Sequence, residues 1–420
     1  MKELRVNSVA NPEQHVATVA RKANWLRSPQ RVWLRRAIFQ IHLWVGVIIA
    51  LYCVVIGLSG SALVFKDEIE HVTEAQVYRI TPGPQKITLE QAIRAIEAGR
   101  PGWVASGLMD FGKTSEATTV LMRRTKGAPD SNYRMVRFNP YTGAVLLDRM
   151  RYDGVLGWIS NLHFYLLSGK VGLQVSGWMA VGLLLLCISG LVVWWPGVQR
   201  WAGAMVLRLH GRKRINWKRL NWDLHSVVGF WSCAALLAVT FTGLYFAFPA
   251  ATGAITVVAT GGSPSKAMAQ IEAPDRKPAP SSAPAMTVDQ VVAAARKALP
   301  QNAPPNYLYL PGKPGVPFSA TGYYNGSLPY SQLVRISLDP HTGEVLGKAD
   351  TTRQMLGLRV IQYFFTVHFG SFGGQGWLGI AVKILWFFVG LVPVLLAVTG
   401  LIMYWNRKLR PLWLRLNKSS

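Results

Sequence analysis

Long runs of apolar residues alternate with polar stretches along the chain. Four of these runs reach or exceed the roughly 20 residues that a helix needs to cross a bilayer. They are His42 to Phe65, Val171 to Trp195, Ser226 to Phe248 and Trp377 to Trp405. The pattern therefore predicts an integral membrane α-helical protein with four spans, at residues 37–65, 171–195, 225–249 and 377–405.

The two long connections, 66–170 and 250–376, have a different pattern. Each contains a segment with a capping Thr and helical apolar spacing, Thr88 to Ile96 in the first and Thr287 to Ala295 in the second. Alternating strands and an Asn/Asp-Pro-x-Thr-Gly turn follow. Each connection is predicted to hold a small α+β module. Residues 259–286, rich in Ala, Ser, Pro and Gly, are predicted to be a flexible linker.

The charge follows the same division of the chain. Half of the residues are hydrophobic, 15% are charged, and the net charge is +25. Residues 1–40, 196–224 and 406–420 hold 20 Lys and Arg against 3 Asp and Glu, whereas the two long connections hold 24 against 17. By the positive-inside rule, the basic segments 1–36, 196–224 and 406–420 are predicted to be cytoplasmic, with both termini, and the modules to lie on the opposite side. Basicity that follows topology in this way indicates a lipid bilayer as the partner and argues against nucleic acid.

Four groups of residues recur in the same order in the two halves of the chain, which indicates an internal two-fold repeat. His42 and His225 each open a span that carries a Ser/Thr-Gly pair near its end. The other corresponding segments are Asn139–Leu146 with Asp339–Leu346, His163-Phe164 with His368-Phe369, and Ser189–Trp195 with Thr399–Trp405. The sequence therefore reads as two copies of span, module, span.

Four of the eight histidines form two corresponding pairs across this repeat. His42 and His225 lie about 10 Å past basic runs, which places both in the cytoplasmic leaflet. His163 and His368 lie in aromatic stretches typical of the opposite interface. A polar ring in lipid should face the bundle interior and hold a partner. Because two neutral imidazoles from facing helices suit a haem iron, the pattern predicts two bis-histidine haems, one near each membrane face.

Other interpretations of these residues stay open. A histidine near a span end is also typical of a hydrogen-bonding residue at the interface. Zinc is less suitable because no Cys or carboxylate completes a tetrahedral set nearby. The three cysteines form no Cys-x-x-Cys-His motif, so a haem would be of the b type. Lys383, a cation within the fourth span, is predicted either to neutralise a haem propionate or to extend to the surface.

As an ordered set, these motifs resemble the PepSY-associated transmembrane family over roughly residues 35–407, and most closely its iron-regulated inner-membrane proteins. The resemblance implies PepSY-like periplasmic modules and a multi-pass protein of the bacterial inner membrane. It also implies a haem b reductase that passes electrons to the Fe(III) of a ferric siderophore or another chelate. His42, His163, His225 and His368 match the family's motif positions.

In this interpretation a cytoplasmic or quinol donor supplies the electrons. Two other functions remain open. One is a sensor or binding protein whose modules bind a periplasmic ligand and whose histidines are structural. The other is a siderophore transporter, for which four spans are few.

Overall fold

The structure is a computed structural model of the 420-residue chain, and it describes residues 25–26, 29–126, 132–207, 216–271, 276–278, 282–313, 315–374 and 376–417. Most of the N-terminal basic segment, 1–24, and the centre of the basic loop, 208–215, lie outside this range. So do parts of the predicted linker and the last three residues of the tail.

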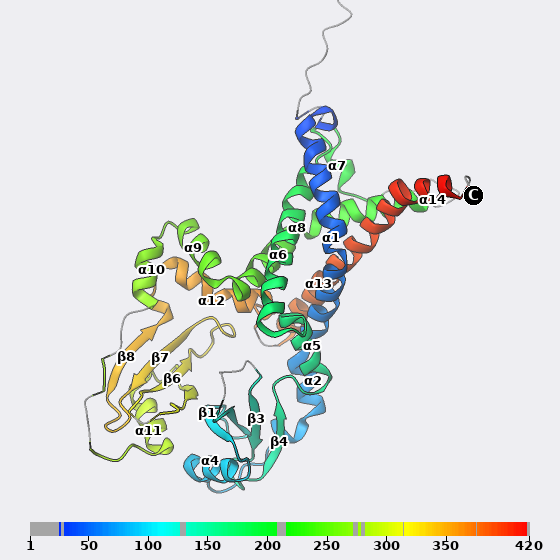
Figure 1. Cartoon of the computed structure of the whole chain (residues 1–420). Coiled ribbons are helices and arrows are strands. Elements are labelled where there is room, and N and C mark those ends of the chain that lie inside the picture. Colours follow the sequence, from blue (N-terminus) through cyan, green and yellow to red (C-terminus); the bar gives the residue numbers. More distant parts are fainter. Residues whose placement is uncertain are drawn as a thin grey trace, which may run out of the picture.

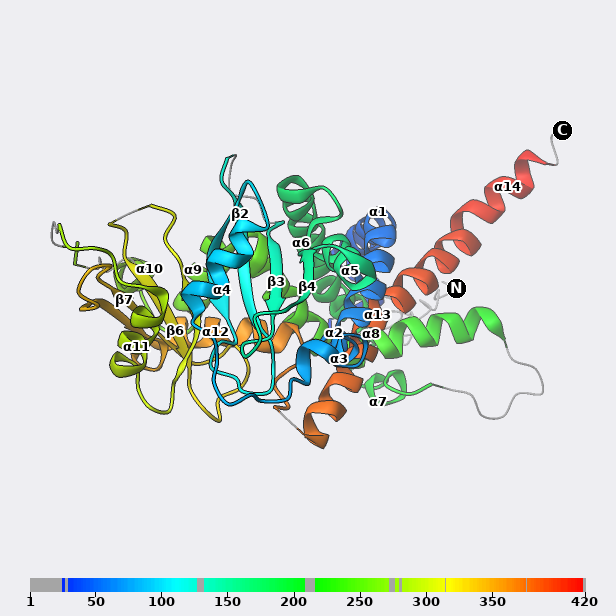
Figure 2. The ribbon, with the colours of Figure 1, turned by 90° about the horizontal axis from the view of Figure 1, so that it is seen from below.

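Four helices in the described residues are long and apolar enough to cross a membrane. They are α1 (Trp33–Leu63), α6 (Gly169–Trp194), α8 (Trp217–Ala247) and α13 (Trp377–Tyr404), so the four predicted spans are confirmed as helices. Large apolar side chains on their outer faces are exposed, for example Leu51 at 76% and Trp377 at 80%, as expected of surfaces that contact lipid. A π-helical turn (Trp405–Leu409) and α14 (Arg410–Leu416) extend α13 away from the bundle (Figures 1 and 2).

The four spans form a closed ring of contacts, in which α1 packs on α13 and α6, and α8 packs on the same two helices. Consequently α1 and α8 lie diagonally across the bundle. Small residues bring α1 and α13 close together. A Cβ at Gly57 would lie 2.7 Å from the carbonyl oxygen of Gly390, and the hydroxyl of Ser61 donates to Phe387 O at 2.9 Å.

The long connections form two α+β modules at one end of the bundle (Figure 1). Module 1 consists of α4 (Leu89–Ala98) with strands β1 (Trp103–Met109), β2 (Thr118–Arg124), β3 (Arg134–Phe138) and β4 (Val145–Met150). Module 2 consists of α11 (Val288–Ala298) with β5 (Pro305–Tyr309), β6 (Phe318–Tyr323), β7 (Leu333–Leu338) and β8 (Val345–Asp350). Antiparallel pairing of β1 with β5 joins them into one eight-stranded sheet, ordered β4-β3-β2-β1-β5-β6-β7-β8.

Each module begins as its sequence predicts. The hydroxyl of Thr88 accepts from Gln91 N at the start of α4, and Thr287 with Gln290 forms a capping box on α11. Both predicted turns are present, and Gly143 and Gly343 adopt φ values of 75° and 70° there. The apolar faces of α4 and α11 cover one common core beneath the joined sheet, with Leu108, Val120, Leu308 and Val334 buried in it.

Short helices connect the modules to the bundle. α2 (Lys66–Thr73) and α3 (Ala75–Tyr78) follow α1, and Arg149 of β4 forms ion pairs with Glu70 of α2 and with Glu74, the residue between the two helices. α5 (Gly154–Tyr165) precedes α6, and α12 (Leu356–His368) follows a short 3₁₀ turn, Thr351–Arg353. The side-chain amide of Gln332 in the β6–β7 loop donates to Tyr363 OH at 3.2 Å, which attaches module 2 to α12.

The structure differs from the sequence predictions in two places, the start of the third span and the linker. Residues 216–224 were predicted as part of a loop, but α8 begins at Trp217, where the side chain of Asn216 accepts from Arg219 N. Helix α9 (Pro249–Ala259) follows α8 directly. The predicted flexible linker contains α10 (Pro264–Ile271), which folds because Ala267 is buried against the cluster formed by α9 and α12. A further short helix, α7 (Trp201–Ala204), lies in the basic loop.

Candidate functional site

The diagonal arrangement of α1 and α8 brings two of the candidate histidines together inside the bundle. The ring centroids of His42 and His225 lie 6.3 Å apart, and the ring planes are perpendicular. Both residues lie near the ends of their helices that carry the basic residues. The two imidazoles therefore face each other across the bundle axis.

The other two candidate histidines meet at the end of the bundle nearest to the modules. His163 of α5 and His368 of α12 also have ring centroids 6.3 Å apart, with an interplanar angle of 53°. Phe246 of α8 lies edge-on to His368 at 5.2 Å, and Phe164 lies edge-on to His163 at 5.6 Å. The second pair is thus enclosed by aromatic side chains.

One span hydroxyl contacts the Nδ1 atom of each histidine. Ser189 lies 2.9 Å from His42 Nδ1 and Thr399 lies 2.9 Å from His225 Nδ1. At the other end, Ser59 lies 3.0 Å from His163 Nδ1, and Thr242 lies 3.3 Å from His368 Nδ1. The same contact therefore occurs four times, each between a different pair of helices.

These contacts determine which ring nitrogen carries the proton. Each hydroxyl donates its hydrogen to the carbonyl four residues earlier, at 2.6 to 2.8 Å, so its oxygen is left to accept from the imidazole. The carbonyl oxygen of Val239, which can only accept, also lies 3.0 Å from His368 Nδ1. The geometry therefore assigns the proton to Nδ1 and leaves the Nε2 lone pair of each ring free for a ligand bond.

A glycine follows each of these hydroxyl residues and leaves room for the ring. A Cβ at Gly60 would lie 2.8 Å from His163 Cε1, and one at Gly243 would lie 2.9 Å from His368 Cε1. The corresponding distances are 3.3 Å from Gly190 to His42 Cε1 and 3.5 Å from Gly400 to His225 Cε1. The repeated Ser/Thr-Gly pairs of the sequence are thus where the candidate histidines pack. The sequence showed these pairs as repeats without linking them to the histidines.

The spacing within each pair can be compared with what a bridging metal needs. A metal–imidazole bond is about 2 Å long. In a five-membered ring with bonds of about 1.33 Å, each nitrogen lies roughly 1.1 Å from the centroid. Two rings on opposite sides of one metal would therefore have centroids about 6.2 Å apart. The observed 6.3 Å in both pairs is close to the spacing that two imidazoles would have if they held one metal between them.

The second pair also has the protonation state that ligation requires. Burial, followed by the neighbouring His368, lowers the pKa of His163 to about 3, and burial lowers the pKa of His368 to about 4. Both rings are therefore neutral near pH 7, as a metal ligand must be.

The remaining candidates behave differently. Lys383 Nζ lies 2.6 Å from Glu68 Oε1 of α2, an ion pair that sequence reasoning did not foresee, and its suggested contact with a propionate stays a prediction. The buried Cys53, Cys187 and Cys233 are free thiols. Within the described residues, no group of three or more His, Cys, Asp or Glu side chains could hold a metal ion. His15 and His210 lie outside those residues.

Fold and site together define a class, namely a membrane protein with four spans, paired α+β modules and two facing histidine pairs. The chain belongs to the family described as PepSY-associated TM region, which matches residues 39–407. A comparison with curated proteins gives no match.

Proposed function

We propose that the chain is a haem b-containing reductase of the bacterial inner membrane, which passes electrons across the bilayer to the Fe(III) of a ferric siderophore or similar chelate in the periplasm. In this proposal the basic ends of the spans and both termini are cytoplasmic. The modules are periplasmic, and the two halves of the chain form a two-fold repeat. A cytoplasmic or quinol donor supplies the electrons.

One observation carries the proposal, which is the repeated arrangement of histidine, hydroxyl and glycine at both ends of the bundle. Each imidazole is oriented through Nδ1, fits against a glycine and faces a second imidazole 6.3 Å away. An interfacial hydrogen-bonding histidine would need the hydroxyl but would not need a facing partner at this spacing. Metal ligation explains both features.

The two histidine pairs lie at different depths in the bundle, and α1 contacts both. His42 and Ser59, the partner of His163, are 17 residues apart on α1, which corresponds to roughly 25 Å along the helix axis. His42 and His225 would hold one haem near the cytoplasmic face, and His163 and His368 would hold a second near the modules. Haem bound at these positions supplies one-electron chemistry.

The chain's own contribution is to bind, orient and enclose. The four hydroxyls fix the imidazole tautomers, and Phe164, Phe246 and Phe369 exclude water from the pair nearest the modules. No protein acid or base is needed for the substrate. Reduction promotes iron release because Fe(II) binds hard oxygen ligands more weakly than Fe(III) does.

The visible spectrum of the full-length protein, purified from haem-replete cells, tests the proposal. We expect a b-type α-band after reduction with dithionite, and two haems per chain. His42→Ala and His225→Ala should abolish the same haem, while His163→Ala and His368→Ala should abolish the other. His71→Ala, at an exposed histidine stacked on Tyr78, is the matched control and should retain both.

A colourless preparation, or loss of haem in crossed pairs, would contradict the proposal. A colourless but folded protein would instead favour a periplasmic binding or sensor protein, or a siderophore transporter. Oxidation of the reduced protein by a ferric hydroxamate or catecholate, followed as decay of the α-band, then tests the substrate.

A further inference from the structure

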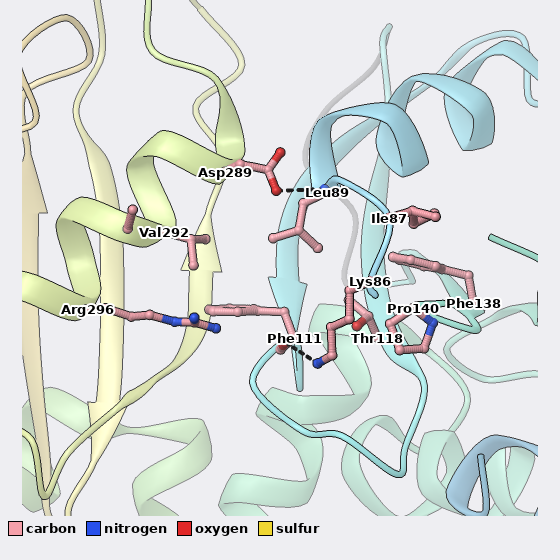
Figure 3. Close-up of a pocket in the computed structure, with 11 residues that line it drawn as sticks. Lys86, Ile87, Leu89, Phe111, Thr118, Phe138, Pro140, Asp289, Val292 and Arg296 are labelled. Atoms are coloured by element: carbon pink, nitrogen blue, oxygen red, sulfur yellow. Dashed lines mark hydrogen bonds between the residues drawn. The ribbon is translucent and has the colours of Figure 1, made fainter. Parts of the chain in front are cut away.

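A cavity of about 370 Å³ lies at the seam between the two modules (Figure 3), and none of the four candidate histidines is among its lining residues. Its walls come from both halves of the chain. Module 1 supplies the segment before α4 and the ends of β1, β2 and β3, and module 2 supplies one face of α11. The volume is within the range of small-molecule sites, about 300–1,000 Å³.

Two cations line this cavity without a carboxylate partner in the described residues. Lys86 Nζ donates to the carbonyl oxygens of Phe111, at 3.2 Å, and Lys113, which leaves one of its three hydrogens for another acceptor. Arg296 extends from α11 toward the same space (Figure 3). Burial, and then the charge of Arg296, lower the pKa of Lys86, which indicates that the two cations repel each other across the cavity.

The one carboxylate among the lining residues is already engaged. The two oxygens of Asp289 accept from Leu89 N at 2.9 Å and from Glu90 N at 3.0 Å, at the start of α4. In return, Glu90 accepts from Val288 N at 3.1 Å, at the start of α11. The helix N-termini of the two modules are therefore capped by each other's acids, and within the described residues neither Lys86 nor Arg296 forms an ion pair with these carboxylates.

The wall of the cavity also contains a buried hydroxyl that lacks a hydrogen-bond partner. Thr118, the first residue of β2, is fully buried and lines the cavity, and its Oγ1 has no hydrogen-bond partner. Buried polar groups are nearly always paired, so an unpaired one beside two cations requires an explanation. Because Oγ1 has almost no accessible surface, a ligand oxygen would reach it only if the wall around it moved.

The remainder of the wall is apolar. Phe111, Phe138, Leu89 and Val292 surround the polar groups. We propose that this cavity binds a small organic carboxylate, whose anionic group lies between Lys86 and Arg296 and whose apolar body packs on the accessible part of the apolar wall. Such a ligand would contact both modules at once and would stabilise their seam.

Calorimetric titration of the full-length protein in detergent with benzoate, and with its neutral isostere benzamide, tests this proposal. Benzoate should bind saturably with a dissociation constant of about 1 mM or lower. Benzamide should bind at least about tenfold more weakly, because it cannot form charge-assisted hydrogen bonds as an acceptor. Hexanoate, which has the same charge and an aliphatic body, should compete with benzoate.

Substitutions locate the site. Arg296→Gln and Lys86→Gln should each weaken benzoate binding by about tenfold to a hundredfold. Lys297→Gln removes the same charge from the neighbouring position on α11, which does not line the cavity, and should leave the affinity unchanged. Because Arg296 is exposed and has no structural partner, its variant should fold normally, which circular dichroism can verify.

Three results would each overturn the proposal. They are no saturable binding of benzoate or hexanoate, equal affinity for benzoate and benzamide, and equal effects of Arg296→Gln and Lys297→Gln. None of these measurements depends on haem, so their outcome is separate from that of the proposed reductase.

Discussion

The glycines beside the histidines allow a graded test of the proposed haem sites. In Gly60→Ala, the new Cβ would lie 2.8 Å from Cε1 of His163, 3.4 Å from its Nδ1 and 3.7 Å from its Nε2. Carbon atoms in ordinary contact are about 3.5–4.0 Å apart, so the ring must retreat by about 0.7 Å or more. A functional side chain tolerates a displacement of only about 0.5 Å. We therefore expect the affinity for the haem near the modules to fall by about 10- to 100-fold.

The other three glycines calibrate this effect. Gly243→Ala places a Cβ 2.9 Å from His368 and should act as strongly as Gly60→Ala. Gly190→Ala gives 3.3 Å to His42, which a few tenths of an ångström would relieve. Gly400→Ala gives 3.5 Å to His225, an ordinary contact, and is the matched control. In the control, the only expected effect is a free energy of unfolding higher by roughly 1 kcal/mol, because Ala is favoured over Gly within a helix.

Haem content per chain, measured as the pyridine haemochrome, and titration of haem into depleted protein would quantify the series. Full retention of both haems by Gly60→Ala, with unchanged affinity, would refute the inferred packing of His163. Equal loss in Gly60→Ala and Gly400→Ala would refute the reasoning from distances, because the second substitution causes no close contact.

Three further predictions concern hydrogen bonds and ion pairs. Ser59→Ala leaves the Nδ1–H of His163 without this acceptor and should lower haem affinity about 10- to 100-fold in a haem titration, while Ser59→Thr should restore it; equal affinity in all three proteins would contradict the assigned role. Asp289→Ala removes a cap worth about 1–2 kcal/mol, so amide exchange at the start of α4 should accelerate about 5- to 30-fold, and unchanged exchange would show that the seam does not need this carboxylate. Burial raises the pKa of Asp148, but its ion pairs, including that with Arg134 at 2.5 Å, outweigh burial and hold the pKa below its usual value. Stability from Asp148 is thus present above about pH 3.9 and is lost as the pH falls through the lowered pKa, so acid unfolding of module 1, followed by amide exchange, should be less steep in Asp148→Asn.

The sequence was most informative where a single physical requirement acts on a whole segment. A bilayer demands about 20 apolar residues per helix, and this requirement located all four spans to within a few residues, except where α8 begins earlier. Helix α8 extends through Trp217–Leu224 because a helix satisfies its own backbone groups in water as well as in lipid. Hydropathy marks the lipid boundary and cannot mark the end of the helix.

Local turn chemistry was equally predictable. The partners of cap and turn residues lie only a few residues away, as for the Thr caps of α4 and α11 and the glycines of the two turns. The sequence alone therefore predicts these roles. Composition misled at 264–271, because Ala and Ser are compatible with both a linker and a short helix. Burial of Ala267 against α9 and α12, a tertiary contact, decides for the helix.

Contacts between distant segments were beyond sequence reasoning. Ser59 and His163 are 104 residues apart, and Lys383 and Glu68 are 315 apart. The residues of one segment do not determine which distant segment it contacts, because that depends on how the helices pack. The recurrence of Ser/Thr-Gly on every span was the available signal, since a hydroxyl followed by glycine at four matched places suggests a ring that needs both an acceptor and space.

The joined sheet has a consequence for dissecting this protein. Strands β1 and β5 pair with each other, so neither module leaves this edge strand open while the chain is intact. A fragment containing one module alone would expose a flat row of unsatisfied amides and carbonyls, which is a template for self-association. Truncated forms should therefore self-associate or precipitate, because only in the intact chain does each module cover the edge strand of the other.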